Sequence, residues 1–440
     1  MKVVGAYMVS DTGPAAAQND AITNRWHIVT GCILFTLAGF NLRTVILAVP
    51  PVLPLIRHDL DLSYTATGLL TSLPVLVMGG TAWPAGMLAS RIGGRNSVSL
   101  GLTLLAIGSA LRAVWPSAIA LYVCTVLLSL GIAIGQTAIP ILARQWFPTR
   151  IGLVSALFSD GLIIGEAVAA GITVPVVLGI LGRDAWRASF VIWTIPVALA
   201  LVLWLVFAQP AAPLAFGRRG DGARTPVGAH EPAHRRANAG VSPLHLGVVL
   251  GSGSLIFFGM NGWIATYNQA IHASSMTPIA LVVLNSAQLP VSLGMTPFAQ
   301  HLSGRRWTFV LAGAICSLAI LGWAVSPPAF EILWAALLGG SSSFVFVLGI
   351  ALTALLAGPE DVARLTGFTL TLSYGVAFIG PLLGGSLWDA LHVPLLAFLP
   401  VFAAGVALVV LGAKLPPRSA FGLDPTDLTE RAHQVFTSAE

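Results

Sequence analysis

The chain has 440 residues, of which 56% are hydrophobic and only 9% are charged, whereas about a quarter of the residues of a soluble domain carry charge. A surface so poor in charge excludes a water-soluble globular protein of this size. The formal net charge of +5 does not indicate a nucleic-acid partner, because the arginines lie in short loops between apolar runs. We therefore expect the lipid bilayer to surround most of the chain.

The apolar residues form runs long enough to cross a bilayer, which takes about 20 residues in a helix. Six such runs precede a polar stretch rich in Pro and Arg, and six follow it. The sequence therefore predicts an all-α membrane protein with 12 transmembrane helices. We expect an N-terminal tail (residues 1–25), a six-helix bundle (26–208), a linker (209–243), a second six-helix bundle (244–413) and a C-terminal tail (414–440). The runs are 28–56, 65–88, 97–114, 117–143, 151–181, 188–208, 244–271, 278–300, 307–325, 331–356, 365–390 and 393–412.

The basic residues predict the orientation of the chain in the membrane. Of the 22 Lys and Arg, 17 fall on the cytoplasmic side if the N-terminus is placed there. Lys and Arg are enriched in cytoplasmic loops. We therefore expect a multi-pass protein of a bacterial inner membrane with both termini and the linker in the cytoplasm. The four basic residues assigned to the outside are Arg57, Arg112, Arg183 and Arg187.

The two halves of the chain resemble each other in sequence. Gly39-Phe40-Asn41 in the first helix is matched by Gly259-Met260-Asn261 in the seventh, and the loop ASRIGGR (89–95) is matched by AQHLSGR (299–305). Many transporters are built from such repeats, with the substrate site at the interface of the halves near the middle of the bilayer.

The loop GMLASRIGGR (86–95) resembles the signature that the major facilitator superfamily carries between helices 2 and 3, with Ser90 in place of the usual acid. This resemblance implies a fold of two pseudo-symmetric six-helix bundles and a transport function. It also implies that Arg91 and Arg95, with Arg305 in the matching loop, take part in gating at the cytoplasmic side.

Within that superfamily the chain resembles the cyanate/2-nitroimidazole transporter family. The resemblance rests on Asn41-Leu42-Arg43 followed by Pro50-Pro51, and on the segments GLLTSLPV (68–75), 139–148 and 374–381. Two positions depart from the family pattern: Thr44 replaces a proline, and Leu370 stands where a glutamine is often found. The family's substrates are therefore not transferred to this chain.

Arg43 is the strongest functional signal in the sequence. It lies about 15 residues, or roughly 22 Å, into the first helix, which is close to the middle of the bilayer. A charge at that depth costs at least ~3 kcal/mol on insertion scales and so faces a partner or a water-filled cavity. Its fork of donors suits carboxylate-like anions. Contact with an anionic substrate and a purely structural ion pair both remain open.

Glu166 is a second charged residue in mid-membrane, in the middle of the fifth helix. Burial favours the neutral form of a carboxyl group, so Glu166 is a candidate to carry a proton; simple neutralisation of Arg43 is the alternative. If the two pair, a substrate anion would compete with Glu166 for Arg43, which would couple binding to protonation. Asp160, nearer the cytoplasmic end, is a further candidate for proton coupling, or for a gating or loop contact. Gly161 and Gly165 lie on another face, where a neighbouring helix can approach closely.

The C-terminal half contributes uncharged groups to the predicted site. Buried amides in a membrane must find partners, so each can serve either as a substrate contact or as a link between helices. The aromatic candidates can equally be packing residues. The candidates are Asn261, Trp263 and Asn268 in the seventh helix, Asn285 and Gln288 in the eighth, Phe344 in the tenth and Tyr374 in the eleventh.

Other classes of membrane protein lack support in the sequence. The two lysines, Lys2 and Lys414, are terminal, so the phosphate-binding loop of an ATP-driven pump is missing. The helices hold no cluster of paired histidines with a carboxylate, as an enzyme would need, and we expect neither cofactor nor metal. The sequence thus predicts a monomeric secondary transporter that moves a small solute, most simply a small anion together with protons, by alternating access. The alternative is an exporter of neutral drug-like or nitroimidazole-type compounds in which Arg43 is structural.

Overall fold

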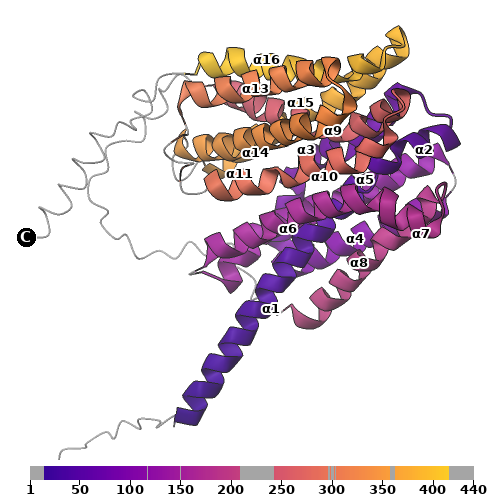
Figure 1. The fold of residues 1–440 in the computed structure, drawn as a ribbon. Helices are drawn as coiled ribbons and strands as arrows, with labels where there is room; N and C mark the ends of the chain where they lie inside the picture. Colours follow the sequence, from indigo (N-terminus) through magenta and orange to yellow (C-terminus); the bar gives the residue numbers. More distant parts are fainter. Residues whose placement is uncertain are drawn as a thin grey trace, which may run out of the picture.

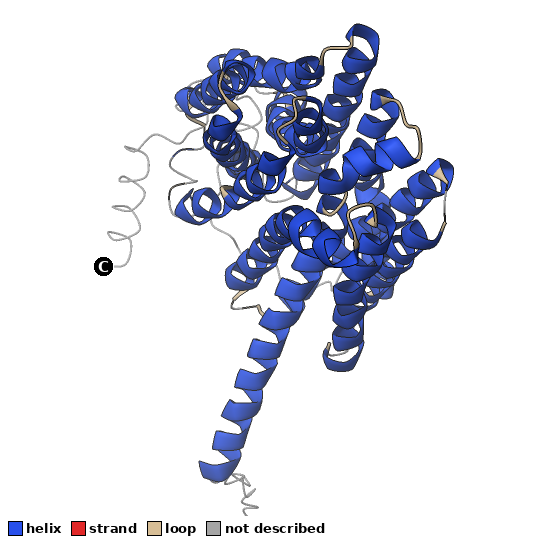
Figure 2. Ribbon diagram, turned by 45° about the vertical axis from the view of Figure 1, so that its right-hand side comes forward, coloured by secondary structure: helices blue, strands red, loops and turns tan. Residues whose placement is uncertain are grey.

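The computed structural model describes residues 14–115, 117–148, 150–208, 242–295, 298, 302, 304–356 and 362–415. Within these ranges the chain is helical and contains no strand (Figure 2). Twelve of its helical spans are long and apolar enough to cross a membrane, so the predicted all-α fold with 12 transmembrane helices is confirmed. Most of the predicted linker (209–241) and the outer parts of both tails (1–13 and 416–440) lie outside the described residues.

The N-terminal half supplies six of the membrane spans. Its first helix begins at Pro14, inside the segment predicted as a tail, because Pro suits the first turn of a helix and the alanines after it favour helix. The elements of this half are α1 (Pro14–Leu47), η1 (Pro50–Val52), α2 (Leu53–Asp59), α3 (Tyr64–Ile92), α4 (Gly94–Val114), α5 (Ala118–Trp146), α6 (Ile151–Ile172), η2 (Thr173–Leu178), α7 (Gly179–Leu181) and α8 (Trp186–Phe207).

The C-terminal half supplies the other six spans and packs against the first along its length (Figure 1). The elements of this half are α9 (Pro243–Ala270), η4 (Ser274–Met276), α10 (Thr277–Ser286), α11 (Gln288–Met295), α13 (Arg306–Val325), η5 (Pro328–Phe330), α14 (Glu331–Leu356), α15 (Val362–Leu391), η6 (Pro394–Phe398) and α16 (Leu399–Ala413). We call the end of the molecule where α1 begins and α16 ends the terminal end, and the opposite end the far end.

Prolines interrupt several of the predicted runs. Pro50 has no N–H to donate to the carbonyl of Ile46, four residues back. That carbonyl accepts a hydrogen bond from the Val49 N–H instead, at 3.2 Å. The first span therefore breaks after Leu47 and continues as η1 and α2. The eighth span, predicted as one run, is likewise divided into α10 and α11, just before Pro290. These breaks free backbone carbonyls and redirect side chains near the middle of the protein.

Small residues bring α1 and α6 into close contact. A Cβ atom at Gly161 would overlap the carbonyl oxygen of Thr36, and one at Gly165 would overlap that of Phe40. A helix can approach this closely only where glycine leaves room. The predicted close approach at Gly161 and Gly165 is confirmed, and the neighbouring helix is α1, the one that carries Arg43.

The repeat seen in the sequence is also present in local geometry. Asn41 on α1 donates from Nδ2 to the carbonyl of Leu37, at 2.9 Å. Its counterpart Asn261 on α9 donates from Nδ2 to the carbonyl of Phe257, at 3.0 Å. Both side chains thus bond back to their own helix one turn earlier, at matching places in the two halves.

Candidate transport site

Arg43 and Glu166 form an ion pair inside the protein. Arg43 projects from α1 and Glu166 from α6, and Arg43 Nε lies 3.3 Å from Glu166 Oε1. The two side chains are only 11% and 5% exposed. Gln288, at the start of α11 in the other half, donates from Nε2 to Glu166 Oε2 at 3.1 Å. Three of the predicted residues therefore form one chain of polar contacts that crosses the interface between the halves.

The ion pair leaves part of the Arg43 guanidinium without hydrogen-bond partners. Nε and Nη1 are buried, and neither makes a hydrogen bond of good geometry. The guanidinium carbon lies 5.8 Å from the centre of the Phe258 ring. An unsatisfied buried donor costs about 1–3 kcal/mol, and such groups in a folded protein call for an explanation such as a ligand or a water. Two nitrogen atoms of the Arg43 guanidinium, Nε and Nη1, therefore have no hydrogen-bond acceptor.

The amides of the C-terminal half extend this polar chain. Asn285 on α10 donates from Nδ2 to Asn261 Oδ1 at 2.9 Å, and Gln288 also donates to the Asn285 carbonyl at 3.3 Å. A continuous path of hydrogen bonds therefore runs from Glu166 through Gln288 and Asn285 to Asn261. The sequence suggested these amides one by one, but not that they contact one another.

A small cavity lies beside this network, between the two halves. Phe258 and Asn261 of α9 form one side, and the broken end of the first span forms another. The cavity is lined by Ile46, Leu47, Val49, Pro50, Leu70, Thr71, Pro74, Arg112, Phe258, Asn261 and Gly262. Its walls are mostly apolar with three polar side chains, those of Thr71, Arg112 and Asn261, and its enclosed space of about 10 Å³ is enough for one water molecule.

Arg112 in this lining corrects the sequence analysis, which counted it among the outside loop residues. It lies in the last turn of α4 and is 2% exposed. Its Nη2 and Nε donate to Thr125 Oγ1 at 2.7 and 3.2 Å, and its Nη1 donates to the Val45 carbonyl at 3.3 Å. The counting of charges placed Arg112 outside because it lies close to a helix end, yet α1 and α5 cover it completely.

Other predicted residues lie away from this cavity. Asn268 donates to Glu331 Oε2 at 2.8 Å, two turns along α9 towards the far end. Trp263 is fully buried, with its ring centre 5.7 Å from that of Trp388. Phe344 packs against the core of the C-terminal half.

Two more predicted residues have separate surroundings. Tyr374 on α15 packs next to Gly79 on α3, across the interface between the halves. Asp160 is half-buried and makes no hydrogen bond or ion pair with any other residue that the structure describes. The structure therefore does not bring Asp160 to Glu166 and Arg43.

The predicted gating arginines differ from one another in their contacts. Arg95 donates to the carbonyls of Ala208 and Leu205, at 2.8 and 3.1 Å, at the end of α8 in its own half. Arg306 makes the matching contact, donating to the Leu415 carbonyl after α16. In both halves a cation thus lies at a helix C-terminus, where it is stabilised. Arg91 and Arg305 are exposed, and neither side chain forms a hydrogen bond or ion pair with the residues that the structure describes.

The two halves are joined at the far end by a contact that the sequence analysis missed. Asp389 at the end of α15 accepts hydrogen bonds from the backbone N–H groups of Tyr64 and Thr65, at 2.9 and 2.7 Å, and from Thr65 Oγ1, at 2.6 Å. The Tyr64 ring stacks on Trp388, with 4.0 Å between ring centres. Arg57 lies over the other face of the Tyr64 ring, 3.9 Å from its centre.

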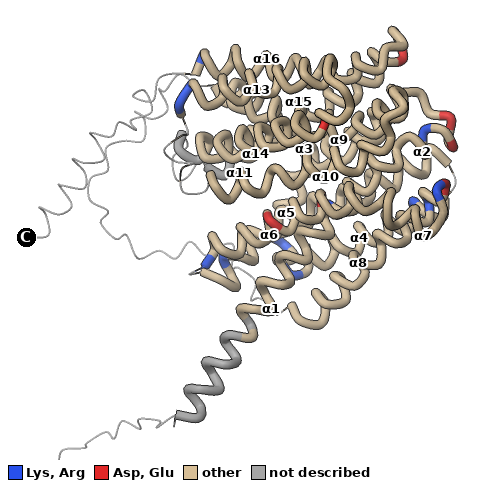
Figure 3. The backbone as a smooth tube through the Cα atoms, viewed as in Figure 1, with Lys and Arg blue, Asp and Glu red and all other residues tan. Residues whose placement is uncertain are grey.

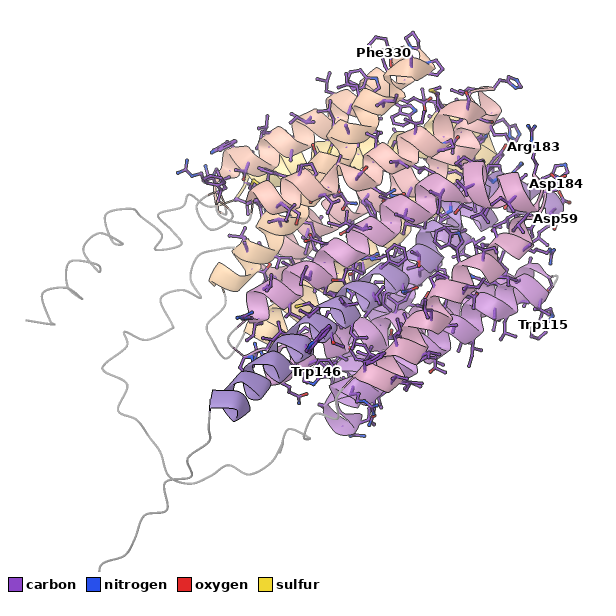
Figure 4. The ribbon with its side chains drawn as sticks, turned by 60° about the horizontal axis from the view of Figure 1, so that its bottom comes forward. Asp59, Trp115, Trp146, Arg183, Asp184 and Phe330 are labelled. Atoms are coloured by element: carbon purple, nitrogen blue, oxygen red, sulfur yellow. The ribbon has the colours of Figure 1, made fainter. Side chains whose placement is uncertain are left out.

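Figure 4 shows where this end lies. The labelled Asp59, Arg183 and Asp184 of the N-terminal half and Phe330 of the C-terminal half are all at the far end, whereas Trp146 lies towards the terminal end. Hydrogen bonds join the halves at the far end, through Asp389, and farther from it, between Gln288 and Glu166 and between Thr371 and the Gly79 carbonyl.

Twelve membrane spans in two similar halves, with polar side chains gathered where the halves meet, define a membrane transporter rather than an enzyme. The chain belongs to the Major Facilitator Superfamily, whose sequence model matches residues 29–303. The resemblance found in the sequence is thereby confirmed.

Relatives in sequence are transporters. The chain is 26% identical to the uncharacterized transporter YycB of Bacillus subtilis (strain 168), over 90% of this chain and 94% of the relative. It is 27% identical to the cyanate transport protein CynX of Escherichia coli (strain K12), over 81% and 89% of the two chains. It is 28% identical to the 2-nitroimidazole transporter of the same bacterium, over 83% and 89%.

Solved structures support the fold. A D-xylose–proton symporter superposes with a TM-score of 0.69 at 13% identity, over 89% of this chain and 98% of the other. A POT family transporter in complex with 5-aminolevulinic acid superposes with a TM-score of 0.66 at 14% identity, over 87% and 94%. At these identities the likeness concerns the fold alone.

Proposed function

We propose that this transporter carries a small, singly charged organic or inorganic anion by alternating access, and that Glu166 couples its movement to protons. The observation that carries the proposal is the contact chain from Arg43 through Glu166 to Gln288, which is buried, charged and shared by both halves. A guanidinium with unsatisfied donors suits a small anion, including a planar one, and Phe258, whose ring centre lies 5.8 Å from the guanidinium carbon, lines the adjoining cavity.

The proposed coupling follows from the charge of the buried pair. Ionised Arg43 and Glu166 together carry no net charge. Adding an anion alone, or a proton alone, to this pair would leave an unbalanced charge on Arg43 and Glu166, which costs several kcal/mol (order of magnitude). Adding both restores neutrality, because the protonated Glu166 releases Arg43 to the anion. One anion and one proton therefore move together.

Gln288 provides the proposed link to alternating access. Its amide bonds to an ionised carboxylate across the interface between the halves. Protonation of Glu166 replaces this charge-assisted hydrogen bond with a neutral one, which is about half as strong. Loading of the site would thus weaken a contact that holds the halves in their present arrangement.

The proposed orientation places the terminal end in the cytoplasm of a bacterium, at its inner membrane. Figure 3 shows basic residues at both ends of the molecule. By the bounds of the helices they are more numerous at the terminal end among the described residues, and the positive-inside rule favours that side. Those at the terminal end are Arg91, Arg95, Arg144, Arg150, Arg305, Arg306 and Lys414, against Arg57, Arg183, Arg187 and the buried Arg112 at the far end.

A second candidate is export of a neutral, nitroimidazole-type compound. It is supported by the likeness to the 2-nitroimidazole transporter and by the apolar and aromatic walls of the cavity, which include Phe258. In this case the Arg43–Glu166 ion pair would be permanent, and no anion would displace Glu166.

The two candidates are separated by thermal unfolding of the purified protein with added solutes. Cyanate, formate or acetate should raise the melting temperature, and Arg43→Gln should reduce this rise. Arg91→Gln, which removes an exposed arginine that forms no hydrogen bond or ion pair with the described residues, is the matched control and should keep the full rise. If 2-nitroimidazole stabilises the protein and none of the anions does, the neutral-cargo function replaces the anion function.

A further inference from the structure

Arg112 has a buried positive charge that no carboxylate balances. Among the described residues no Asp or Glu oxygen lies within 4.0 Å of its guanidinium, since ion pairs at that limit join only Arg43 to Glu166 and Arg187 to Asp59. Its neighbours are the hydroxyl of Thr125, the carbonyl of Val45 and the ring of Phe190. All three are neutral, so the local charge is a full +1 in a site with 2% exposure.

The contacts of Arg112 with neutral groups explain where its side chain lies, but none of them balances its positive charge. Val49 turns its N–H to Ile46 because of the proline break, which leaves the Val45 carbonyl free to accept a hydrogen bond from Arg112. An arginine has five N–H donors, and the three hydrogen bonds to Thr125 and Val45 use three of them. Two N–H donors and the whole charge remain for another partner.

The cavity next to Arg112 is the place where such a partner would bind, and its enclosed space of about 10 Å³, enough for one water molecule, must widen to admit an anion. Arg112 lines it together with the polar side chains of Thr71 and Asn261, and both halves of the protein contribute to the walls. Ile46 and Leu47 in the same lining follow Arg43 by about one helical turn, or roughly 5 Å along α1. The cavity therefore lies on the far-end side of Arg43, which is not itself part of the lining.

From these observations we infer that Arg112 binds the transported anion in this cavity. This would be a second binding site in addition to the one at Arg43, and we call it the Arg112 station. The inference rests on the proposed anion function and adds a residue that determines specificity for charge. An anion at Arg112 balances that charge while Glu166 stays ionised on Arg43, so binding at this station takes up no proton. Transfer from Arg112 to Arg43 requires Glu166 to be protonated.

In this arrangement one residue determines the affinity for the anion, and another determines the coupling of transport to protons. Arg112 sets how tightly the anion is held, because its charge is fixed and its cavity is mostly apolar. Glu166 sets how movement depends on protons. Removing the charge of Arg112 should therefore weaken anion binding without removing the pH dependence of transport, whereas a purely structural role would change the stability of the protein and leave charge selectivity intact.

The test measures binding of cyanate to the full-length protein, and its uptake into proteoliposomes, for Arg112→Gln and Arg112→Lys. We expect Arg112→Gln to weaken cyanate binding about 10- to 100-fold, as for loss of a hydrogen-bonded charge, to retain the wild-type response to pH, and to leave any binding of neutral 2-nitroimidazole unchanged. Arg112→Lys keeps the charge and should recover most of the affinity. Arg183→Gln, an exposed arginine at the same end, is the matched control.

The results of this test distinguish a failure of the inference on Arg112 from a failure of the proposed anion function. If wild type binds cyanate and folded Arg112→Gln binds it equally well, Arg112 is structural and the inference is overturned, while the proposed function stands. If wild type binds none of cyanate, formate or acetate, both are overturned. Where Arg112→Gln does not fold, Asn261→Asp places a negative charge on the opposite wall with little change in shape. It should abolish anion binding, and unchanged binding would contradict the inference.

Discussion

Asp389 at the end of α15 caps the start of α3 through Thr65, so one half of the protein supplies the N-terminal cap of a helix in the other. Ser63 already caps the third N–H of α3, that of Ala66. Asp389 satisfies the first two, from Tyr64 and Thr65. The unsatisfied N–H groups of a helix start favour a negative charge. The arrangement in which the far end is closed is thereby stabilised by a contact that must break if that end opens.

Asp389→Asn should therefore shift the protein towards an arrangement that is open at the far end. Asparagine removes the charge and can accept fewer hydrogen bonds, so we expect a loss of about 1–2 kcal/mol from the closed arrangement, as for other helix caps. Spin labels at Arg183→Cys and Phe330→Cys, in a background without the three native cysteines, would report the distance between the halves at this end. The population with longer distances should grow.

Asp59→Asn is the control for this experiment. Asp59 is also at the far end, but its ion pair with Arg187, at 2.9 Å, lies within the N-terminal half. It should leave the distance distribution as in wild type. An unchanged distribution in Asp389→Asn would show that this cap does not control opening.

Glu166→Gln should make transport independent of pH. In wild type, protonation of Glu166 frees Arg43 for the anion, so uptake should rise as the pH on the side of entry falls and decline as it increases. Glutamine cannot take up a proton, and its neutral amide leaves Arg43 available at all pH values. Uptake of cyanate into proteoliposomes across a range of external pH would measure this. A wild-type pH profile in Glu166→Gln would remove Glu166 from the coupling step.

Gly165→Ala should destabilise the protein by separating α1 from α6. Its added methyl group would overlap the Phe40 carbonyl, and crowding of this kind costs about 1–3 kcal/mol. Gly152 lies on the same helix with open space around it, so Gly152→Ala should be neutral or slightly stabilising. Thermal unfolding of the two variants in detergent makes the comparison. Equal melting temperatures would mean that the close approach is not required.

Arg95→Ala and Arg91→Ala should differ in stability even though both arginines belong to one signature loop. Arg95 loses two hydrogen bonds to the end of α8, which we expect to cost about 1–3 kcal/mol for bonds from a charged donor. Arg91 is exposed and loses no such contact. Thermal unfolding should show a lower melting temperature for Arg95→Ala alone, and an equal drop in both would contradict this assignment.

The fold was largely predictable because the bilayer imposes a simple rule on the sequence. Each span must be apolar over about 20 residues, and the twelve spans are separated by short polar loops. Arg43 and Glu166 were predictable as partners for a related reason, since isolated charges at the middle of the membrane need each other or a ligand. The structure brings them within 3.3 Å.

The parts that could not be predicted depend on which helices lie side by side. Asp389 reaches Thr65 across 324 positions of the chain, and nothing local in either segment indicates that contact. Arg112 lies near a helix end, where an exposed position is the usual expectation. Its burial follows from how α1 and α5 cover it. Such pairings are properties of the assembled halves rather than of any one run of residues.

The most direct measurement of the central claim is the number of protons taken up when the purified transporter binds an anion. In a weakly buffered solution with a pH indicator, saturating cyanate should cause uptake of up to about one proton per protein in wild type, as protonated Glu166 gives up Arg43 to the anion. The same addition to Glu166→Gln should bind cyanate without proton uptake. Because an anion at Arg112 takes up no proton, the deciding case is Arg112→Gln: binding of cyanate by this variant with no proton taken up at any pH would contradict the exchange of carboxylate for anion at Arg43.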